Sequence, residues 1–235
     1  MQGIGAHEVV VPRSHSKFIS QMSPKEVELI IRAYQDRFLA HVKDTCTRYV
    51  LIFHNHGAAA GASIWHPHSQ IIALPIIPPD LYRSVSGSKR YHIEYGQCVH
   101  CQMVRIELQK KDRFIYRNKG FAVIAPFASR VSFEMRIFPI RHKAYFQNIT
   151  PQERLLLADA LVVALGSMRK VLKDPAFNFF IHTAPVVRGK FDFYHWHLEI
   201  LPKTAHLAGV ELGSGIEVVS VAPERAASLL RKEIK

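Results

Sequence analysis

Apolar residues recur at helical spacing in two long segments of the chain. Three or four residues separate successive apolar positions in each segment, which gathers them on one face of an α-helix. These positions are Val27, Ile30, Tyr34, Phe38 and Val42 in the first segment, and Leu157, Leu161, Leu165, Met168 and Leu172 in the second. The pattern predicts two amphipathic helices, each of which covers a sheet with its apolar face.

Both predicted helices have the same start signal. The sequence Ser-Pro-Lys-Glu occupies residues 23–26, and Thr-Pro-Gln-Glu occupies residues 150–153. In each, the Ser or Thr and the Glu three residues later form a capping box, and the Pro stands at the first helical position, where its missing N–H group costs nothing. We therefore expect helices that begin at Pro24 and Pro151.

The segments around these helices also repeat. Upstream of each helix a Pro precedes a His by three residues, and downstream a β-rich run is followed by a loop and a His-x-His strand. The corresponding segments are Pro12–His15 with Pro139–His142, YVLIFHN (49–55) with FNFFIHT (177–183), and HPHSQIIAL (66–74) with HWHLEIL (195–201). The chain therefore contains a strand, helix, strand, strand unit twice. We predict an α+β fold with mostly antiparallel sheets and helices packed on them.

The two copies differ in the sequence that precedes them. We divide the chain into a first half, residues 1–85, and a second half, residues 86–235. The second half starts with a Cys-x-x-Cys motif and two strand candidates, at 113–118 and 121–126, and it ends in a predicted helix. The first half has no counterpart to that leading sequence, so by this internal comparison we expect it to be incomplete at its amino end.

Composition and charge limit the classes of function. With 235 residues, 48% of them hydrophobic, the chain can bury a substantial core. The formal net charge of +12 attracts anions, whether nucleic acid, nucleotide or sugar phosphate. Because the basic residues are scattered and no zinc-finger or RNA-recognition pattern is present, no specific nucleic-acid partner is expected. No apolar stretch reaches the roughly 20 residues of a membrane span and the start has no leader pattern, so we expect a cytoplasmic protein with no membrane partner.

Two cysteines and two histidines suggest a metal site. Cys98 and Cys101 form a Cys-x-x-Cys motif, and the repeat independently selects His142 and His195 as histidines at matching positions. Two thiolates and two imidazoles are a donor set typical of tetrahedral zinc. The alternatives are a redox pair or two buried thiols, although no thioredoxin-like βαβ pattern surrounds the motif.

The first half has the matching imidazoles but no matching thiols. These imidazoles belong to His15 and His66, which would be ligands of a first site. Two ligands alone make a weak zinc site. The third cysteine, Cys46, is out of register with both motifs, and we expect it to be a packed thiol, the commoner role of a lone Cys.

The segment HPHSQ (66–70) carries candidate chemistry for phosphoryl transfer. Side chains alternate along a strand, so His66, His68 and Gln70 are predicted on one face, with Pro67 and Ser69 on the other. If His66 binds a metal or orients its neighbour, His68 is free to attack as a neutral nucleophile, and Gln70 can donate an N–H to a phosphate oxygen. The alternative is a half-buried strand whose histidines are incidental.

The loop before this segment, NHGAAAGAS (55–63), contains Gly57 and Gly61 among alanines. Small residues let backbone amides approach an anion closely. In the second half Glu199 stands where the first half has Gln70, and a carboxylate there would repel a phosphate. We therefore expect the first half to carry the reaction, with His197 and Glu199 of the second half in a supporting polar or metal role.

HPHSQII and HWHLEIL resemble the His-φ-His-φ-His-φ-φ pattern of the histidine-triad superfamily. With the Gln variant, the repeated halves and the ending GVELGSGIEVVSVAPERAASLLR, the chain is similar to the galactose-1-phosphate uridylyltransferase family, including plant-type members that act on adenylyl compounds. The resemblance implies a duplicated histidine-triad-like fold. It also implies an enzyme that moves a nucleoside monophosphate from a nucleotide sugar to a sugar 1-phosphate or phosphate, with His68 as the covalent carrier.

The resemblance implies further site residues. Gln70 would contact the phosphates, and the substrate-binding positions would be Asn55, Gly57, Ser63 and, at the hexose, Glu211. Zinc would be the cofactor, with His15 and His66 as ligands of one site and Cys98, Cys101, His142 and His195 as ligands of the other. A homodimer is also expected. Two alternatives stay open: a nucleotide hydrolase of the histidine-triad type, and a zinc-stabilised nucleotide-binding protein without turnover.

Overall fold

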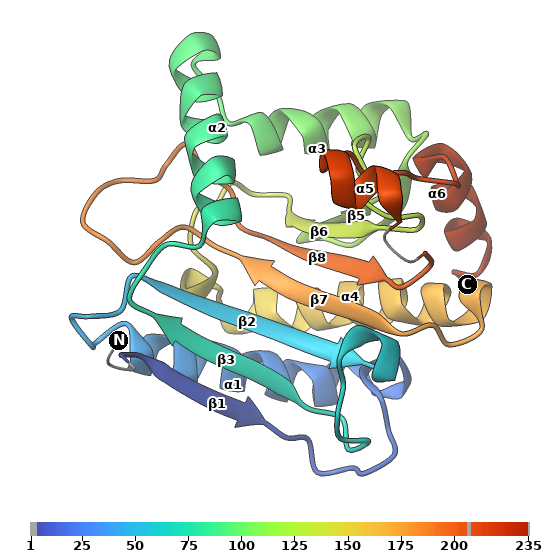
Figure 1. The fold of residues 1–235 in the computed structure, drawn as a ribbon, viewed down its shortest axis with the longest axis horizontal. Helices are drawn as coiled ribbons and strands as arrows, with labels where there is room; N and C mark the ends of the chain where they lie inside the picture. Colours follow the sequence, from blue (N-terminus) through green and yellow to red (C-terminus); the bar gives the residue numbers. More distant parts are fainter. Residues whose placement is uncertain (1–3, 206–207, 235) are drawn as a thin grey trace.

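The centre of the protein is a single sheet of eight strands. A computed structural model describes residues 4–205 and 208–234, and every neighbouring pair of strands in it is antiparallel. The strand order across the sheet is β1-β3-β2-β7-β8-β6-β5-β4 (Figure 1). The strands are β1 (Ala6–Val10), β2 (Tyr49–His56), β3 (Ser69–Leu74), β4 (Phe114–Arg117), β5 (Phe121–Ile124), β6 (Met135–Pro139), β7 (Phe177–His182) and β8 (His197–Pro202). The α+β, antiparallel prediction is confirmed.

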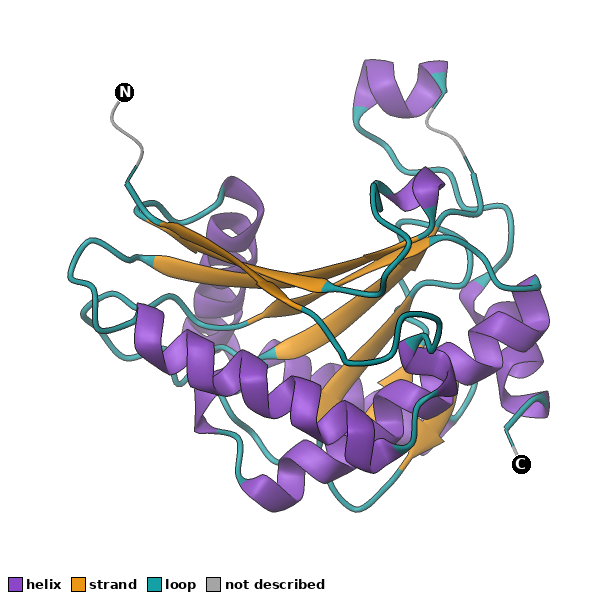
Figure 2. Cartoon of the chain, turned by 90° about the horizontal axis from the view of Figure 1, so that it is seen from below, coloured by secondary structure: helices purple, strands orange, loops and turns teal. Residues whose placement is uncertain are grey.

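Helices cover the sheet unevenly. The two longest, α1 and α4, lie side by side on one face, which Figure 2 shows beneath the strands. On the other face α3 contacts β4 and β5, and α2 packs on α3 (Figure 1). The helices are α1 (Pro24–His41), α2 (Pro79–Tyr95), α3 (Val99–Lys110), α4 (Pro151–Leu172), α5 (Gly209–Ser214) and α6 (Pro223–Lys232). None of the helices in the described ranges is long and apolar enough to cross a membrane.

Both long helices begin where the sequence predicts. The side chain of Ser23 accepts a hydrogen bond from the Glu26 amide at the start of α1, and Thr150 accepts one from the Glu153 amide at the start of α4. Their predicted apolar faces point into the core. The predicted positions that are fully buried are Val27, Ile30, Tyr34 and Phe38 in α1, and Leu157, Leu161, Leu165 and Met168 in α4, while Val42 and Leu172 are partly buried.

The strands on either side of the sheet centre have mirrored order. β1, β3 and β2 contact α1, whereas the other half has the order β6, β8 and β7, and α4 contacts β6 together with β5 and β4. The two sets meet where β2 pairs with β7, with Ile52 opposite Ile181. The strand candidates at 113–118 and 121–126 are present as β4 and β5, which extend the sheet beyond β6. One sheet and one main core therefore span both predicted halves.

The sheet face opposite α1 is accessible over β1, β3 and β2, and we call it the open face. Burial alternates strictly along β3, whereas residues 197–200 of β8 are all buried. α3 helps to bury β8, because His100 of α3 packs against the ring of His197. The open face is where the HPHSQ segment displays its side chains.

Candidate functional site

The histidines of HPHSQ lie just before a strand rather than within one. β3 begins at Ser69, so the prediction that His66 and His68 are strand residues was wrong; the loop that ends at Pro67 delays the pairing. The alternation of faces is nevertheless confirmed, because Pro67 and Ser69 are buried while His66, His68 and Gln70 are half-buried. These three line a cavity of about 420 Å³ with Val9, Val11, Ser63 and Ile64.

The ring of His68 is held in one orientation by a backbone carbonyl group two residues earlier. Its Nδ1 donates a hydrogen bond to the carbonyl oxygen of His66, at 2.8 Å. In the neutral imidazole a proton on Nδ1 leaves a lone pair on Nε2. This contact therefore leaves the Nε2 lone pair of His68 available for a reaction.

Gln70 is oriented by a residue that the sequence did not single out. Nε2 of His7, on β1, donates to Oε1 of Gln70 at 2.8 Å. This contact occupies the amide oxygen and leaves the amide N–H groups of Gln70 free to donate. The pairing of β1 with β3 places the two side chains together, since Val9 lies opposite Gln70. The signal in the sequence that could have indicated this role of His7 is its polar side chain at the start of the otherwise apolar HEVVV run.

A buried polar network lies beneath His68, and sequence reasoning missed it. Nδ1 of His54 is 3.0 Å from the hydroxyl of Ser69, which also forms a hydrogen bond with the hydroxyl of Tyr34. Burial lowers the pKa of His54 to about 3, so its imidazole is neutral. The network holds the side chain of Ser69, the residue that follows His68. Tyr34 was assigned to the core from helical spacing alone, and only the fold shows what its hydroxyl meets.

The small-residue loop adopts conformations that need its glycines. Gly57 and Gly61 have φ of +80° and +85°, and a Cβ on Gly57 would lie 2.9 Å from the Cβ of Ala176. The amide of Asn178 donates to Asn55 Oδ1 and to the carbonyl oxygen of Ala60, both at 2.8 Å. The strand β7 thus holds the loop in place.

This loop borders a second cavity next to the first. The second cavity has a volume of about 370 Å³, and Ser63 and His66 line both. Phe18, His56 and the exposed Trp65 give it an aromatic wall. The further predicted positions that line it are Asn55 and Gly57. The structure therefore brings Asn55, Gly57 and Ser63 into one region with His66 and His68.

His15 and His66 are in direct contact. Their Nδ1 atoms are 2.8 Å apart, and Nε2 of His66 donates to the carbonyl oxygen of Pro12 at 2.7 Å. The pair is brought together as predicted, but in the described ranges it does not form part of a group of three or more metal-ligating side chains.

The four predicted ligands of the second half do form such a group. The ligand atoms of Cys98, Cys101, His142 and His195 all lie within 4.8 Å of one another. Sγ of Cys101 is 3.2 Å from Nδ1 of His142 and 3.4 Å from Nδ1 of His195. A tetrahedral zinc ion would separate a sulfur and a nitrogen ligand by about 3.5 Å. The cluster can therefore hold a metal such as zinc.

His197 and Glu199 lie in a closed environment. They form a second group with His182, whose ligand atoms also lie within 4.8 Å. The carboxylate of Glu199 is already paired with Arg130 and Arg136, and burial lowers the pKa of His197 to about 4. These residues hold each other in the interior.

Two other predicted residues lie apart from HPHSQ. Glu211 caps its own helix, because its carboxylate accepts from the Ala208 amide at 3.0 Å, and α5 lies toward β5 and β6, across the sheet from β1 and β3 (Figure 1). Within these described residues Glu211 is not joined to the His68 region. Cys46 is exposed, so the prediction of a packed thiol was wrong; it follows α1 in a turn where its amide donates to Asp44.

Comparisons with known proteins identify the family of the chain. Residues 2–78 match the family model "Galactose-1-phosphate uridyl transferase, N-terminal domain". The chain is 32% identical to the crystal structure of an ADP-glucose phosphorylase from Arabidopsis thaliana with bound ADP-glucose, covering 98% of this chain and 74% of that one with a TM-score of 0.91. The chain belongs to the galactose-1-phosphate uridylyltransferase family.

Two curated relatives show how much of a family member the chain represents. It is 34% identical over 233 residues to ADP-glucose phosphorylase of Arabidopsis thaliana, covering 98% of this chain and 65% of that protein. It is 28% identical over 237 residues to galactose-1-phosphate uridylyltransferase of Thermotoga maritima, covering 97% of this chain and 74% of that protein. The chain thus spans about two thirds to three quarters of the length of these galactose-1-phosphate uridylyltransferase family members.

Proposed function

We propose that this chain transfers a nucleoside monophosphate from a nucleotide sugar to phosphate or to a sugar 1-phosphate, with His68 as the covalent carrier. The observation that carries the proposal is the free Nε2 of His68 beside the amide of Gln70 in an accessible cavity. The family and its relatives that act on nucleotide sugars support it. The reaction places the chain in carbohydrate metabolism.

The proposed reaction has two steps. Nε2 of His68 attacks the phosphorus next to the nucleoside, a P–N bond forms, and the P–O bond to the sugar phosphate breaks, which releases sugar 1-phosphate. An oxygen of phosphate or of a second sugar 1-phosphate then attacks the same phosphorus and breaks the P–N bond, which restores the neutral His68. Gln70 donates to the charged oxygens in both steps. The loop with Asn55, Gly57 and Ser63 lines the phosphate path.

The two halves have different roles in this proposal. We regard residues 1–85 and 86–235 as copies of one histidine-triad-like unit, supported by the matching helix starts and the mirrored strand order. The first half carries the reaction, and the second supports it. Zinc held by Cys98, Cys101, His142 and His195 would tie the start of α3 to the segments around β6 and β8.

The remaining assignments rest on the family resemblance. His15 and His66 would contribute to a metal site of the first half, and their direct contact is consistent with binding to one metal ion. Glu211 would contact the hexose of a substrate. Its place outside the His68 region means that this role needs a substrate or partner surface on the β5–β6 side of the sheet.

Covalent labelling tests the proposal. ADP-glucose and UDP-glucose, each with ³²P in the phosphate next to the nucleoside, are mixed with stoichiometric protein, and the denatured protein is assayed for acid-labile label. We expect label from one of them on wild type, none on His68→Asn, and undiminished label on His92→Asn, a histidine of α2 outside the site. Release of the label as ADP on adding phosphate supports phosphorolysis.

Two outcomes contradict transfer. Label that water discharges as AMP or UMP as fast as phosphate does would identify a hydrolase. Absence of label with both nucleotide sugars, in protein that binds them by calorimetry, would identify a binding protein without turnover.

A further inference from the structure

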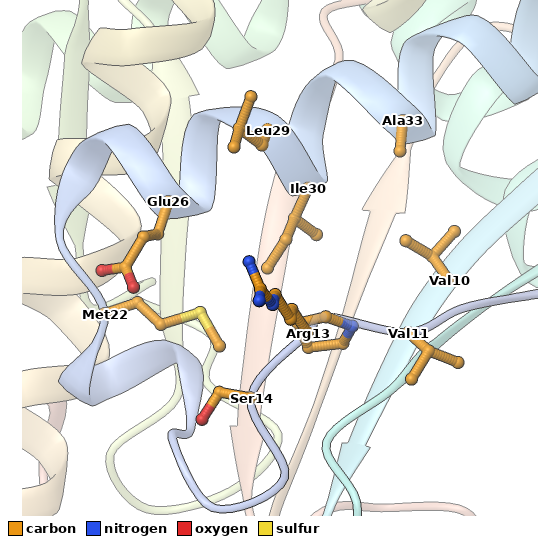
Figure 3. A pocket seen from close by; sticks show the side chains of 10 residues that line it. Val10, Val11, Arg13, Ser14, Met22, Glu26, Leu29, Ile30 and Ala33 are labelled. Atoms are coloured by element: carbon orange, nitrogen blue, oxygen red, sulfur yellow. The ribbon is translucent and has the colours of Figure 1, made fainter.

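His7 and Val9 of β1 lie on the open face, beside Gln70 of the neighbouring strand β3. The residues that alternate with them face the other way: Glu8 is paired with side chains of α1, and Val10 lines a pocket against that helix (Figure 3). Side chains alternate along a strand, so His7 and Val9 share the opposite face. Val9 is directly across the strand pair from Gln70, and His7 is diagonal to it, within reach of a long side chain.

The second half of the chain has an ion pair at the matching positions. Counted from the prolines of the repeat, Val9 corresponds to Arg136, and counted from the first histidine of each His-x-His segment, Gln70 corresponds to Glu199. The two pairs also agree in register, because Arg136 is directly across from Glu199 just as Val9 is from Gln70. Nε of Arg136 is 3.2 Å from the Glu199 carboxylate. In the second half the side chain at this position is thus held from directly across the strand pair.

The first half has an apolar residue at that opposite position and holds Gln70 in another way. Val9 is 55% exposed and has no polar side-chain atom. The side chain that holds Gln70 belongs to His7, whose Nε2 is 2.8 Å from Oε1 of the amide. The residue that corresponds to His7 in the second half is Glu134, which is fully buried and paired with Arg136. The contact of His7 with Gln70 is therefore a feature of the first half that the second half does not repeat.

The amide of Gln70 can take two orientations with opposite consequences for an anion. With its oxygen bound to His7, its NH₂ group is free to donate to an anion in the cavity that Gln70 lines. Turned over, the NH₂ group would donate to His7, and the carbonyl oxygen would present its lone pairs to the same anion. A proton on Nε2 of His7 selects the first orientation. The neutral ring with that proton and the imidazolium both donate from Nε2, so a histidine can keep the amide in place in either charge state.

We propose that His7 is a positioning residue of the transfer reaction, which holds the Gln70 amide with its N–H groups toward the phosphates of the substrate. Among the described residues, those that line the cavity beside His68 do not include His7, so it acts through Gln70. Donors that are already oriented need no rearrangement when charge develops on the phosphate oxygens, so the effect falls on kcat more than on KM. The kinetic part of this inference rests on the proposed function, whereas the orientation of the amide does not.

Replacements of His7 that differ in donor character test the proposal. His7→Lys can only donate to Gln70, His7→Gln can donate or accept, His7→Met can do neither, and His7→Glu at neutral pH can only accept. We expect kcat to fall in that order, with His7→Lys within about threefold of wild type, His7→Met about tenfold lower and His7→Glu about 100-fold lower, while KM changes less. The rate of covalent labelling of His68 should follow the same order. Circular dichroism and thermal melting verify that the variants fold.

A double-mutant cycle with Gln70→Met separates the orientation of the amide from the direct effect of charge. In the Gln70→Met background, His7→Met should cause no further loss of kcat, because the amide that it orients is absent. The difference between His7→Lys and His7→Glu should shrink there to the effect of their charges on the phosphates. A full tenfold loss from His7→Met in that background, or kcat in His7→Gln as low as in His7→Met, would overturn the proposal.

Nuclear magnetic resonance tests the orientation without turnover. The side-chain amide signals of Gln70 in ¹⁵N-labelled protein are assigned by their loss in Gln70→Met and are titrated with inorganic pyrophosphate. Extrapolated to saturation, they should shift in wild type and in His7→Lys, and less than half as far in His7→Glu. The absence of a shift in wild type, or an equal shift in His7→Glu, would overturn the proposal. If the signals behave as expected but no nucleotide sugar labels His68, the transfer function fails and the positioning of Gln70 by His7 stands.

Discussion

In the segment His66–Gln70 the ring of His68 borders a cavity on the open face. In the segment His195–Glu199 the ring of His197 is buried in the second half of the sheet. Both rings make the same contact with the backbone. Nδ1 of His68 donates to the His66 carbonyl oxygen at 2.8 Å, and Nδ1 of His197 is 3.1 Å from the His195 carbonyl oxygen. The local contact that directs Nδ1 to the backbone is therefore common to both segments and does not distinguish them.

The difference lies in what each Nε2 meets. In the second segment Nε2 of His197 is 3.3 Å from the carboxylate of Glu199, which two arginines also hold. In the first segment the corresponding Gln70 has its oxygen bound by His7 and its N–H groups free. One segment can receive an anion, and the other has its own anion in place.

The largest difference between the two segments is expected when the central histidine of each, His68 or His197, is replaced. His68→Asn is expected to lower the turnover of nucleotide sugar at least 10³-fold, because it removes the Nε2 lone pair that is proposed to carry the nucleotidyl group. His197→Asn should leave covalent labelling at His68 measurable while destabilising the fold, because it changes a buried hydrogen-bonded ring. Equal loss of labelling in two well-folded variants would contradict the assignment.

The metal clusters offer a second contrast, between four ligands and two. We expect about one zinc per chain by atomic emission. Cys98→Ser should release it and lower Tm by roughly 10 °C, because a structural zinc site contributes several kcal/mol to folding. His15→Ala, at the exposed two-histidine pair, should retain the zinc. Purified protein without any metal would refute the cluster assignment.

Replacing Gln70 by glutamate gives the first segment the residue that the second segment has at the corresponding position, Glu199. Gln70→Glu places a carboxylate beside the phosphate path and is expected to lower kcat/KM about 100-fold at neutral pH, because it replaces a donor by a like charge. Part of the loss should return as the pH falls and the carboxyl group is protonated. Gln70→Met is the matched control, since it removes the donor without adding charge and should give a smaller, pH-independent loss.

Local signals and long-range pairing explain what the sequence could predict. The helix starts at Pro24 and Pro151 were predictable because a capping box involves only four neighbouring residues. The grouping of His142 and His195 with the two cysteines was predictable because the repeat compares distant positions without needing their geometry. The contact of His7 with Gln70, and of His54 with Ser69, depends on which strands pair and in which register, and no local pattern encodes that.

The buried His54 beneath the first segment predicts a pH dependence of stability. Burial lowers its folded-state pKa from 6.5 to about 3, so the unfolded chain binds a proton that the folded chain does not, and stability is lost as the pH falls below 6.5. Between pH 6.5 and 5 this contribution amounts to about 1.5 kcal/mol. Urea unfolding of His54→Gln should show a pH dependence weaker by that amount. An unchanged pH dependence would mean that His54 takes up protons equally in the folded and unfolded protein, so that burial does not lower its pKa.

The smallest expected effect concerns the hydroxyl groups that hold Ser69. Counting from the first histidine, Ser69 occupies the place of Leu198 in the second segment, so the network with Tyr34 and His54 is a feature of the first segment that the second lacks at this position. Tyr34→Phe removes one hydroxyl without changing the core volume and is expected to lower kcat about threefold to tenfold with little change in KM. A role in positioning acts on the attack of His68 and not on binding, so the rate of labelling should fall by the same factor. If instead KM rises with kcat unchanged, the network shapes the substrate cavity and His68 is positioned by its backbone contact alone.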